Sequence, residues 1–196
     1  MAVPRVGVLA LQGDVHEHVT RLQEIHVDVV LVRRAHDLDD LDGLVLPGGE
    51  STTISHLLNT SGVRSALEDK LRDGLSVFGT CAGLILLSRD VLDGRHDQWS
   101  YGVIDVAVRR NGYGRQIASF EASIEVPGTG TVPGVFIRSP KIERCGAEVE
   151  ILASHDHGDG EGPHPVLVRQ GNAWGCSFHP ELTGDPRIHQ LFVNSL

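Results

Sequence analysis

Cys81 is the residue whose surroundings most strongly indicate chemistry. It lies in FGTCAGLILLSRD (78–90), between an apolar run too short for a helix and apolar residues at helical spacing. Gly79 and Gly83 flank it as G-x-C-x-G, the spacing of a nucleophile elbow, in which a sharp strand-to-helix turn presents a reactive side chain. A helix that begins next to a thiol favours the thiolate. A buried structural cysteine is the alternative, but the small flanking residues favour the nucleophile.

A thiol nucleophile needs a base, and His179 is the best placed of the eleven histidines. It follows the strand-like AWGCSF and precedes Pro180, which ends strand pairing. Glu181 stands two residues further along an extended chain, so its carboxylate can point the same way and orient the imidazole. Alone, His-Pro-Glu is an ordinary turn. Together with Cys81 it predicts a Cys-His-Glu triad.

The stretch LPGGEST (46–52) supplies a third feature of acyl-transfer chemistry. Gly48 and Gly49 leave backbone amides bare at the end of a predicted strand. Such amides suit an oxyanion hole for a tetrahedral intermediate. A flexible turn before a helix is the alternative interpretation of the same residues.

The elements that position these residues are strands and helices in alternation. We expect strands at 5–11, 27–34, 41–49 and 75–80, and helices at 14–25, 51–59, 63–74 and 81–92, with Ser51, Thr52 or Thr53 capping the second helix. Further along, β-branched segments predict strands at 103–111, 116–126 and 131–140, which read as an antiparallel insertion or edge sheet. The end of the chain predicts strands at 148–154, 165–170 and 173–182 and a last helix within 185–196.

The predicted fold is therefore α/β: a single three-layer domain over 1–196, with a mostly parallel central sheet, helices on both faces and a small antiparallel insertion. Ligands of such sheets bind outside the carboxyl ends of the strands. Gln12-Gly13, PGGES, Cys81 and His179 all follow predicted strands. We expect the fold to bring them to one edge.

Composition excludes several other classes of protein. The formal net charge of −9, without a basic run, argues against a nucleic-acid surface. No apolar stretch approaches the ~20 residues that span a bilayer, and the amino terminus lacks the order of a secretory signal. The three cysteines give neither a disulfide framework nor a zinc spacing, and Cys145, in a predicted loop, and Cys176, in a strand, are predicted to be structural. We expect a cytoplasmic protein.

Several longer motifs resemble a known family. PGGES, GTCAGLILL and GCSFHPEL are together similar to the class I, or triad, glutamine amidotransferases. GVLALQGDVHEH, RRNGYGRQIASFEA, GVFIRSP and GCSFHPELTGDPRIHQLF extend the resemblance, from about residue 5 to 195, to the glutaminase subunits of pyridoxal 5′-phosphate synthases. The combination of GGESTT, RNxxGRQ and FIRSP is specific, because other triad amidotransferases lack the last two.

The resemblance implies hydrolysis of L-glutamine to L-glutamate and ammonia. Cys81 would be the nucleophile, His179 the base and later the acid, and Glu181 its orienting carboxylate. The oxyanion donors implied are the backbone amides of Gly49 and Ala82. The glutamine contacts implied are Gly49, Glu50, Ser51, Arg110, Ile137 and Arg138, and a charge-assisted bond from Arg110 to the substrate's α-carboxylate makes chemical sense.

The resemblance also implies a partner, the barrel subunit of the synthase, which receives the ammonia. The expected interface lies in LQGDVHEH and consists of Gln12, Gly13, Asp14, His16 and Glu17. No cofactor and no metal are expected. His16 and His18 stand two apart on a helix and so on different faces, which favours ordinary surface histidines. The His- and Gly-rich residues 155–165 are expected to form an exposed loop.

Three alternatives remain at this point. Another triad amidotransferase, such as the one that feeds imidazole glycerol phosphate synthesis, would lack FIRSP. A binding or redox-sensing protein on the same sheet would not need both His179 and Glu181. A cysteine hydrolase or chaperone-like protein of related topology would leave the PGGES glycines unexplained.

Overall fold

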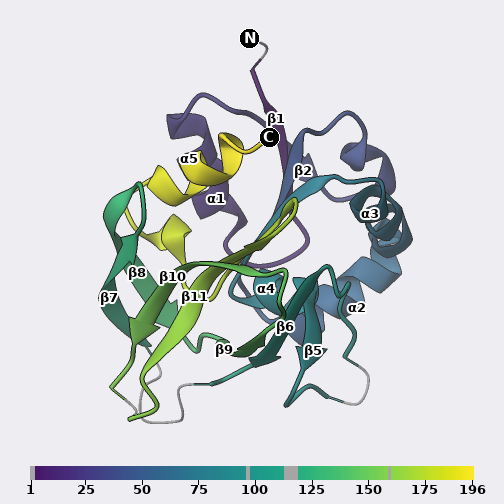
Figure 1. The fold of residues 1–196 in the computed structure, drawn as a ribbon. Coiled ribbons are helices and arrows are strands. Elements are labelled where there is room, and N and C mark those ends of the chain that lie inside the picture. The colour runs from purple at the N-terminus through teal and green to yellow at the C-terminus, as the bar shows by residue number, and fades with distance from the viewer. Residues whose placement is uncertain (1–2, 96–97, 113–118, 159) are drawn as a thin grey trace.

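A large twisted sheet runs through the middle of the computed structural model, which describes residues 3–95, 98–112, 119–158 and 160–196 (Figure 1). Its strands are β1 Arg5–Leu9, β2 Asp28–Val32, β3 Gly43–Leu46, β4 Ser76–Thr80, β10 Glu150–Asp156, β11 Pro163–Gln170 and β12 Ala173–Cys176. They follow the order β10-β11-β12-β4-β3-β1-β2. The strands from β12 to β2 pair in parallel, whereas β10 and β11 pair antiparallel.

Helices cover both faces of this sheet (Figure 1). They are α1 Val15–Glu24, α2 Ser51–Ser61, α3 Val63–Arg72, α4 Ala82–Leu87 and α5 Arg187–Val193, with short 3₁₀ turns η1 Ala35–Leu38 and η2 Pro180–Leu182. Successive strand residues point to opposite faces. Val8 of β1 accordingly packs with Leu22 of α1 and Phe192 of α5, while its neighbour Leu9 packs with the cluster that holds Leu58 of α2. The predicted three-layer α/β fold is confirmed.

The middle of the chain forms two smaller sheets. β5 Ser88–Val91, β6 Ile104–Arg109 and β9 Lys141–Cys145 make one, in which β6 and β9 are antiparallel. β7 Ser119–Val126 and β8 Gly130–Ile137 form an antiparallel hairpin. The expected antiparallel insertion is therefore present, although the start of its segment 116–126 lies outside the described residues. Strand β9 was not predicted, and it contains Cys145, which the sequence placed in a loop.

Three local predictions were wrong. The helix after Cys81 ends at Leu87 rather than at residue 92, because Ser88 turns into β5 and its hydroxyl donates to the carbonyl of Ile85 at 2.7 Å. The amino-terminal cap of α2 is Glu50, not Ser51, Thr52 or Thr53. The predicted loop 155–165 is too long at both ends, since β10 runs to Asp156, β11 begins at Pro163 and His155 pairs with His164. Among the described residues, no helix combines the length and apolar character that crossing a membrane requires.

Candidate active site

A pocket of about 430 Å³ opens at the residues that follow the parallel strands. The predicted site residues that line it are Gln12, Asp14, Gly49, Glu50, Ser51, Cys81, Arg110, Ile137, Arg138 and His179. Three lining residues were not predicted, namely Ile85, Asn111 and Leu182. Ala82, Glu181, Gly13, His16 and Glu17 do not line it. Segments from distant parts of the chain thus meet at one place, as the strand-end argument predicts.

Cys81 lies on a strained turn between β4 and α4. Its φ of 49° and ψ of −102° are sparsely populated for a non-glycine residue, and its backbone N–H donates to the carbonyl of Cys176 at 2.8 Å. The neighbours must be small: a Cβ on Gly79 would lie 2.5 Å from the carbonyl carbon of Gly83, and one on Gly83 would lie 2.0 Å from the carbonyl oxygen of Leu46. The G-x-C-x-G pattern therefore has a direct steric cause.

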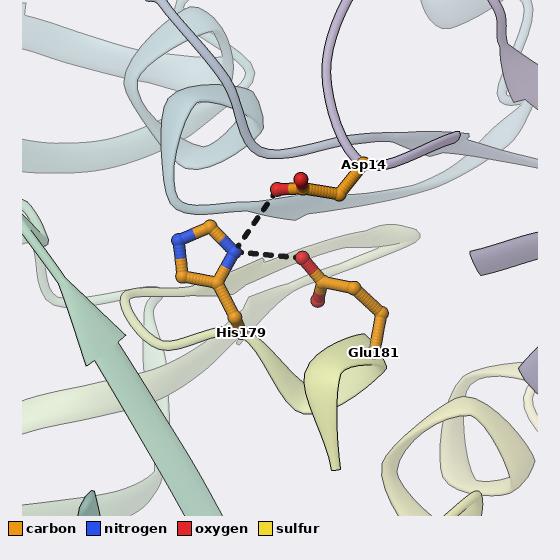
Figure 2. Close-up of side chains that lie close together, drawn as sticks. All are labelled: Asp14, His179 and Glu181. Atoms are coloured by element: carbon orange, nitrogen blue, oxygen red, sulfur yellow. Dashed lines mark hydrogen bonds and ion pairs between the residues drawn. The ribbon is translucent and has the colours of Figure 1, made fainter. Parts of the chain in front are cut away.

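His179 is held between two carboxylates (Figure 2). Its Nδ1 lies 2.7 Å from Oε1 of Glu181 and 3.4 Å from Oδ2 of Asp14. Its other ring nitrogen is turned away from both (Figure 2). Glu181 is buried and bonds His179 without lining the pocket. The contact with Asp14 was not predicted, because Asp14 was assigned to a partner interface.

The charge of His179 is set by these neighbours. Burial disfavours the imidazolium, but hydrogen bonds with Asp14, Cys81 and Glu181 outweigh burial and raise the pKa of His179 far above its usual value. The pKa of Glu181 is raised by burial, against the hydrogen bond from His179. An imidazolium that is hydrogen-bonded to a cysteine stabilises the thiolate. The arrangement therefore suits nucleophilic catalysis.

Asp14, His179 and Glu181 also form the one group in the described part of the chain whose ligand atoms lie close enough to hold a cation, within 4.8 Å of one another. Nδ1 of His179 already bonds Glu181, however, and Cys81 bonds the same ring. These contacts suit orientation of the imidazole, and the expectation that no metal binds here stays a prediction.

Gly49 lies at the pocket wall, where an oxyanion donor is needed. Its φ of 148° is a conformation that favours glycine, and a Cβ there would lie 2.5 Å from Oε1 of Gln12 and 3.1 Å from Cα of Gly13. The same Gln12 oxygen accepts a hydrogen bond from the backbone N–H of Glu50 at 3.0 Å. Gln12 thereby fixes this segment of backbone. Ala82, the other predicted donor, is buried as the first residue of α4, and its role stays a prediction.

Arg110 and Glu50 form a charged pair in the pocket wall. Nη2 of Arg110 donates to Oε1 of Glu50 at 3.1 Å, and the backbone N–H of Arg110 donates to Asp93 at 2.7 Å. The carboxylate of Glu50 also accepts from the backbone N–H groups of Thr52 and Thr53. The guanidinium group of Arg110 therefore binds the carboxylate of Glu50 in the pocket wall. In RNxxGRQ, only the first three residues fall within the described part of the chain.

Two further predicted glutamine contacts lie at the end of β8, namely Ile137, its last residue, and Arg138, which follows it. Ile137 is 37% exposed, and its backbone N–H donates to Oγ of Ser139 at 3.1 Å. Arg138 has a φ of 45°, which is unusual for a side chain of this size. Ser51, at the start of α2, is buried and accepts a hydrogen bond from Gln98 at 3.2 Å. All three predicted residues line the pocket.

Replacement of Glu50 by glutamine should lower the free energy of unfolding by about 1 kcal/mol at neutral pH, because Glu50 caps α2. Burial raises the pKa of Glu50, but bonds from Thr53 and Thr52 outweigh it and lower the pKa to about 2 from an ordinary value of 4.5. The stabilisation is therefore complete above pH 4.5 and lost as the pH falls towards 2. Urea unfolding at pH 7 and pH 3 measures this, with Glu68→Gln as the control because Glu68 is an exposed residue of α3. An equal loss at both pH values would contradict the prediction.

Comparison with known proteins shows the family of this chain. Residues 8–196 match the model of the SNO glutamine amidotransferase family. The chain belongs to this family. The chain is 52% identical to the pyridoxal 5′-phosphate synthase subunit PdxT of Mycobacteroides abscessus, over 97% of this chain and 96% of that one. It is 53% identical to the subunit of the same name from Streptomyces avermitilis, over 99% and 94% of the two chains.

Two solved structures are also similar to this chain. A crystal structure described as a glutamine amidotransferase shares 46% identity and a TM-score of 0.89, with 97% of each chain covered. The structure of PurLQS from Thermotoga maritima shares 15% identity and a TM-score of 0.73, over 98% of this chain and 99% of that one. The second likeness concerns the fold alone.

Proposed function

We propose that this chain is the glutaminase subunit of a pyridoxal 5′-phosphate synthase. It hydrolyses L-glutamine to L-glutamate and ammonia and delivers the ammonia to the barrel subunit of the synthase. The observation that carries the proposal is the meeting of Cys81, His179, Gly49 and the Glu50–Arg110 pair in one pocket. The names of relatives about half identical over nearly the whole chain support the choice of synthase.

Cys81 is the nucleophile in the proposed mechanism. Its sulfur attacks the side-chain amide carbon of glutamine, and the backbone amide of Gly49 stabilises the oxyanion that forms. His179, which holds the thiol proton as an imidazolium, transfers it to the departing nitrogen, and ammonia leaves a γ-glutamyl thioester. His179 then takes a proton from water, which attacks the thioester and releases glutamate. Glu181 and Asp14 keep Nδ1 of His179 oriented throughout.

The charged pair in the pocket wall fits a free amino acid. Glutamine carries an α-carboxylate and an α-ammonium group. The cationic Arg110 can pair with the carboxylate, and the anionic Glu50 can pair with the ammonium group. The low pKa of Glu50 keeps its carboxylate ionised at neutral pH. A peptide-bound glutamine lacks both free charges. We therefore expect the free amino acid to be the substrate.

The proposal is tested by mixing the chain with a cognate pyridoxal 5′-phosphate synthase barrel subunit and measuring glutamate release from L-glutamine. We expect hydrolysis in this mixture and none with heat-inactivated chain. The cyclase subunit of imidazole glycerol phosphate synthase serves as the comparison. Absence of glutamate in the first mixture, or stronger stimulation by the cyclase, would overturn the proposal.

Arg110→Ala should raise the KM for glutamine about tenfold to a hundredfold, since a hydrogen bond to a charged group contributes about 1.5–3 kcal/mol. The rate of Cys81 alkylation by iodoacetamide should stay unchanged, because Arg110 does not touch the triad. Arg109→Ala is the matched control: Arg109 pairs with Glu143 at 3.0 Å and does not line the pocket. A lowered melting temperature in Arg110→Ala without a change in KM would assign Arg110 a structural role.

A cytoplasmic location is part of the same proposal. Cys81, Cys145 and Cys176 are all free thiols, as expected of a reducing compartment. The proposed reaction uses no cofactor and no metal, because thiol attack, proton transfer and thioester hydrolysis are all performed by residues of the chain.

A further inference from the structure

Two histidines that the proposed reaction does not use are buried directly behind the triad. His18 of α1 and His189 of α5 are both 0% exposed, and Nδ1 of His18 lies 2.9 Å from Nε2 of His189. The other nitrogen of His18, Nε2, lies 3.0 Å from Oγ1 of Thr80 and 3.5 Å from Oε2 of Glu181. The prediction that His18 is a surface residue was therefore wrong. It bridges α5 and the carboxylate that orients His179.

Burial favours the neutral form of both rings. It holds the pKa of His18 well below its ordinary value, and the neighbouring His189 and His179 lower that pKa further. Burial and the nearby Arg21 lower the pKa of His189 to about 3. Each neutral imidazole carries one N–H, so its position on each ring is a choice between two tautomers.

The neighbours favour one tautomer. Nε2 of His18 faces two oxygens that can accept, Oγ1 of Thr80 at 3.0 Å and Oε2 of Glu181 at 3.5 Å, so the proton of His18 belongs on Nε2. Nδ1 of His18 then accepts from Nε2–H of His189. This leaves Nδ1 of His189 without a proton, and that atom is buried without a hydrogen-bond partner. A bare acceptor in that place costs less than an unpaired N–H.

The environment of Glu181 shows what His18 supplies. Oε1 of Glu181 bonds His179, whereas Oε2 is buried and has no hydrogen-bond partner in the described chain. Nε2 of His18 faces this oxygen at 3.5 Å, which is longer than an ordinary hydrogen bond, and the same nitrogen lies 3.0 Å from Oγ1 of Thr80. A buried carboxylate oxygen without a donor is costly, and rotation of the carboxylate away from His179 would relieve that cost.

We propose that His18 is a positioning residue whose Nε2–H, fixed by His189, holds the second oxygen of Glu181 so that the first stays on His179. The proposal rests on the proposed function for its kinetic consequence. The geometry connects α5 to the nucleophile through His189, His18, Glu181 and His179 in turn.

Two amide substitutions of His18 test whether it acts as a hydrogen-bond donor or only fills space. In His18→Gln the amide nitrogen occupies the place of Nε2 and can still donate to Glu181. In His18→Asn the amide nitrogen occupies the place of Nδ1, so Glu181 loses its donor. With the synthase barrel present, we expect kcat for glutamine hydrolysis to fall about tenfold to a hundredfold in His18→Asn, a typical loss for groups that orient an ordered histidine. His18→Gln should retain most of kcat, and KM should change little in both.

A second readout needs no partner and no glutaminase activity. Alkylation of Cys81 by iodoacetamide in the free chain should slow in His18→Asn and stay near the wild-type rate in His18→Gln. Equal rates in both variants, whether fast or slow, would overturn the proposal. If the wild-type mixture hydrolyses no glutamine, the proposed function fails, while the alkylation rates still test His18.

The tautomer can be measured without any substitution. Nitrogen-15 chemical shifts of the histidine rings in the wild-type chain should show the proton of His18 on Nε2. A proton on Nδ1, or a doubly protonated ring at neutral pH, would overturn the proposal even if both His18 variants failed to fold.

Discussion

Replacement of Cys81 by alanine should lower glutamine hydrolysis by at least about 10³-fold, because loss of a nucleophile leaves only binding and oxyanion stabilisation. The fold should survive. Alanine keeps the Cβ of Cys81 and removes only the sulfur, and Cys81 belongs to neither of the two hydrophobic core clusters. The measurement is glutamate release in the mixture with the synthase barrel subunit, with the melting temperature recorded in parallel.

Cys145→Ala is the matched control for this substitution. Cys145 ends β9, away from the pocket, and burial raises the pKa of its thiol. It should therefore be neither a nucleophile nor the first site of alkylation. We expect Cys145→Ala to keep full activity and Cys81→Ala to lose labelling by iodoacetamide. Retention of more than about a tenth of the activity in Cys81→Ala would refute the proposed triad.

Gly48→Ala should lower kcat about 10²-fold although it removes no reacting side chain, because misplacement of a catalytic residue by ~1 Å has an effect of that size. A Cβ on Gly48 would lie 2.5 Å from Cε1 and 2.9 Å from Nδ1 of His179, and 3.0 Å from Oδ2 of Asp14. His179 must move to make room. The accompanying loss of unfolding free energy should be about 1–3 kcal/mol, as for other overpacked sites.

Gly184→Ala provides the control, since a Cβ at Gly184 meets nothing within 4 Å. Steady-state kinetics and urea unfolding of both variants measure the two effects separately. Wild-type kcat in Gly48→Ala would show that the imidazole tolerates displacement, and would contradict the geometry proposed for the base.

The position of the site was predictable because it depends on topology. Parallel strands place their carboxyl ends at one edge, so Gln12, Gly49, Cys81 and His179 could be brought together from their places after strands alone. The G-x-C-x-G pattern was equally informative, since both glycines are required by contacts near the elbow.

The errors arose where a contact overrides a local pattern. His18 falls among Val15, Val19 and Leu22 at helical spacing, so the amphipathic pattern already placed it on the buried face of α1. It was overlooked because its spacing of two from His16 was used only to judge a shared metal site, which favoured surface histidines. Its partners, His189 and Glu181, lie far away in the sequence, and no local pattern could reveal them. The cap of α2 was displaced by one residue because a glutamate side chain reaches the same amides that a shorter cap would.

The two glycine segments beside the pocket interlock backbone to backbone. A Cβ on Gly13 would lie 1.8 Å from the carbonyl oxygen of Gly48, and the N–H of Asp14 donates to that same oxygen at 3.3 Å. We therefore expect the two loops to move together. A displacement of either one would shift two features of the proposed mechanism at once, the amide of Gly49 and the carboxylate of Asp14.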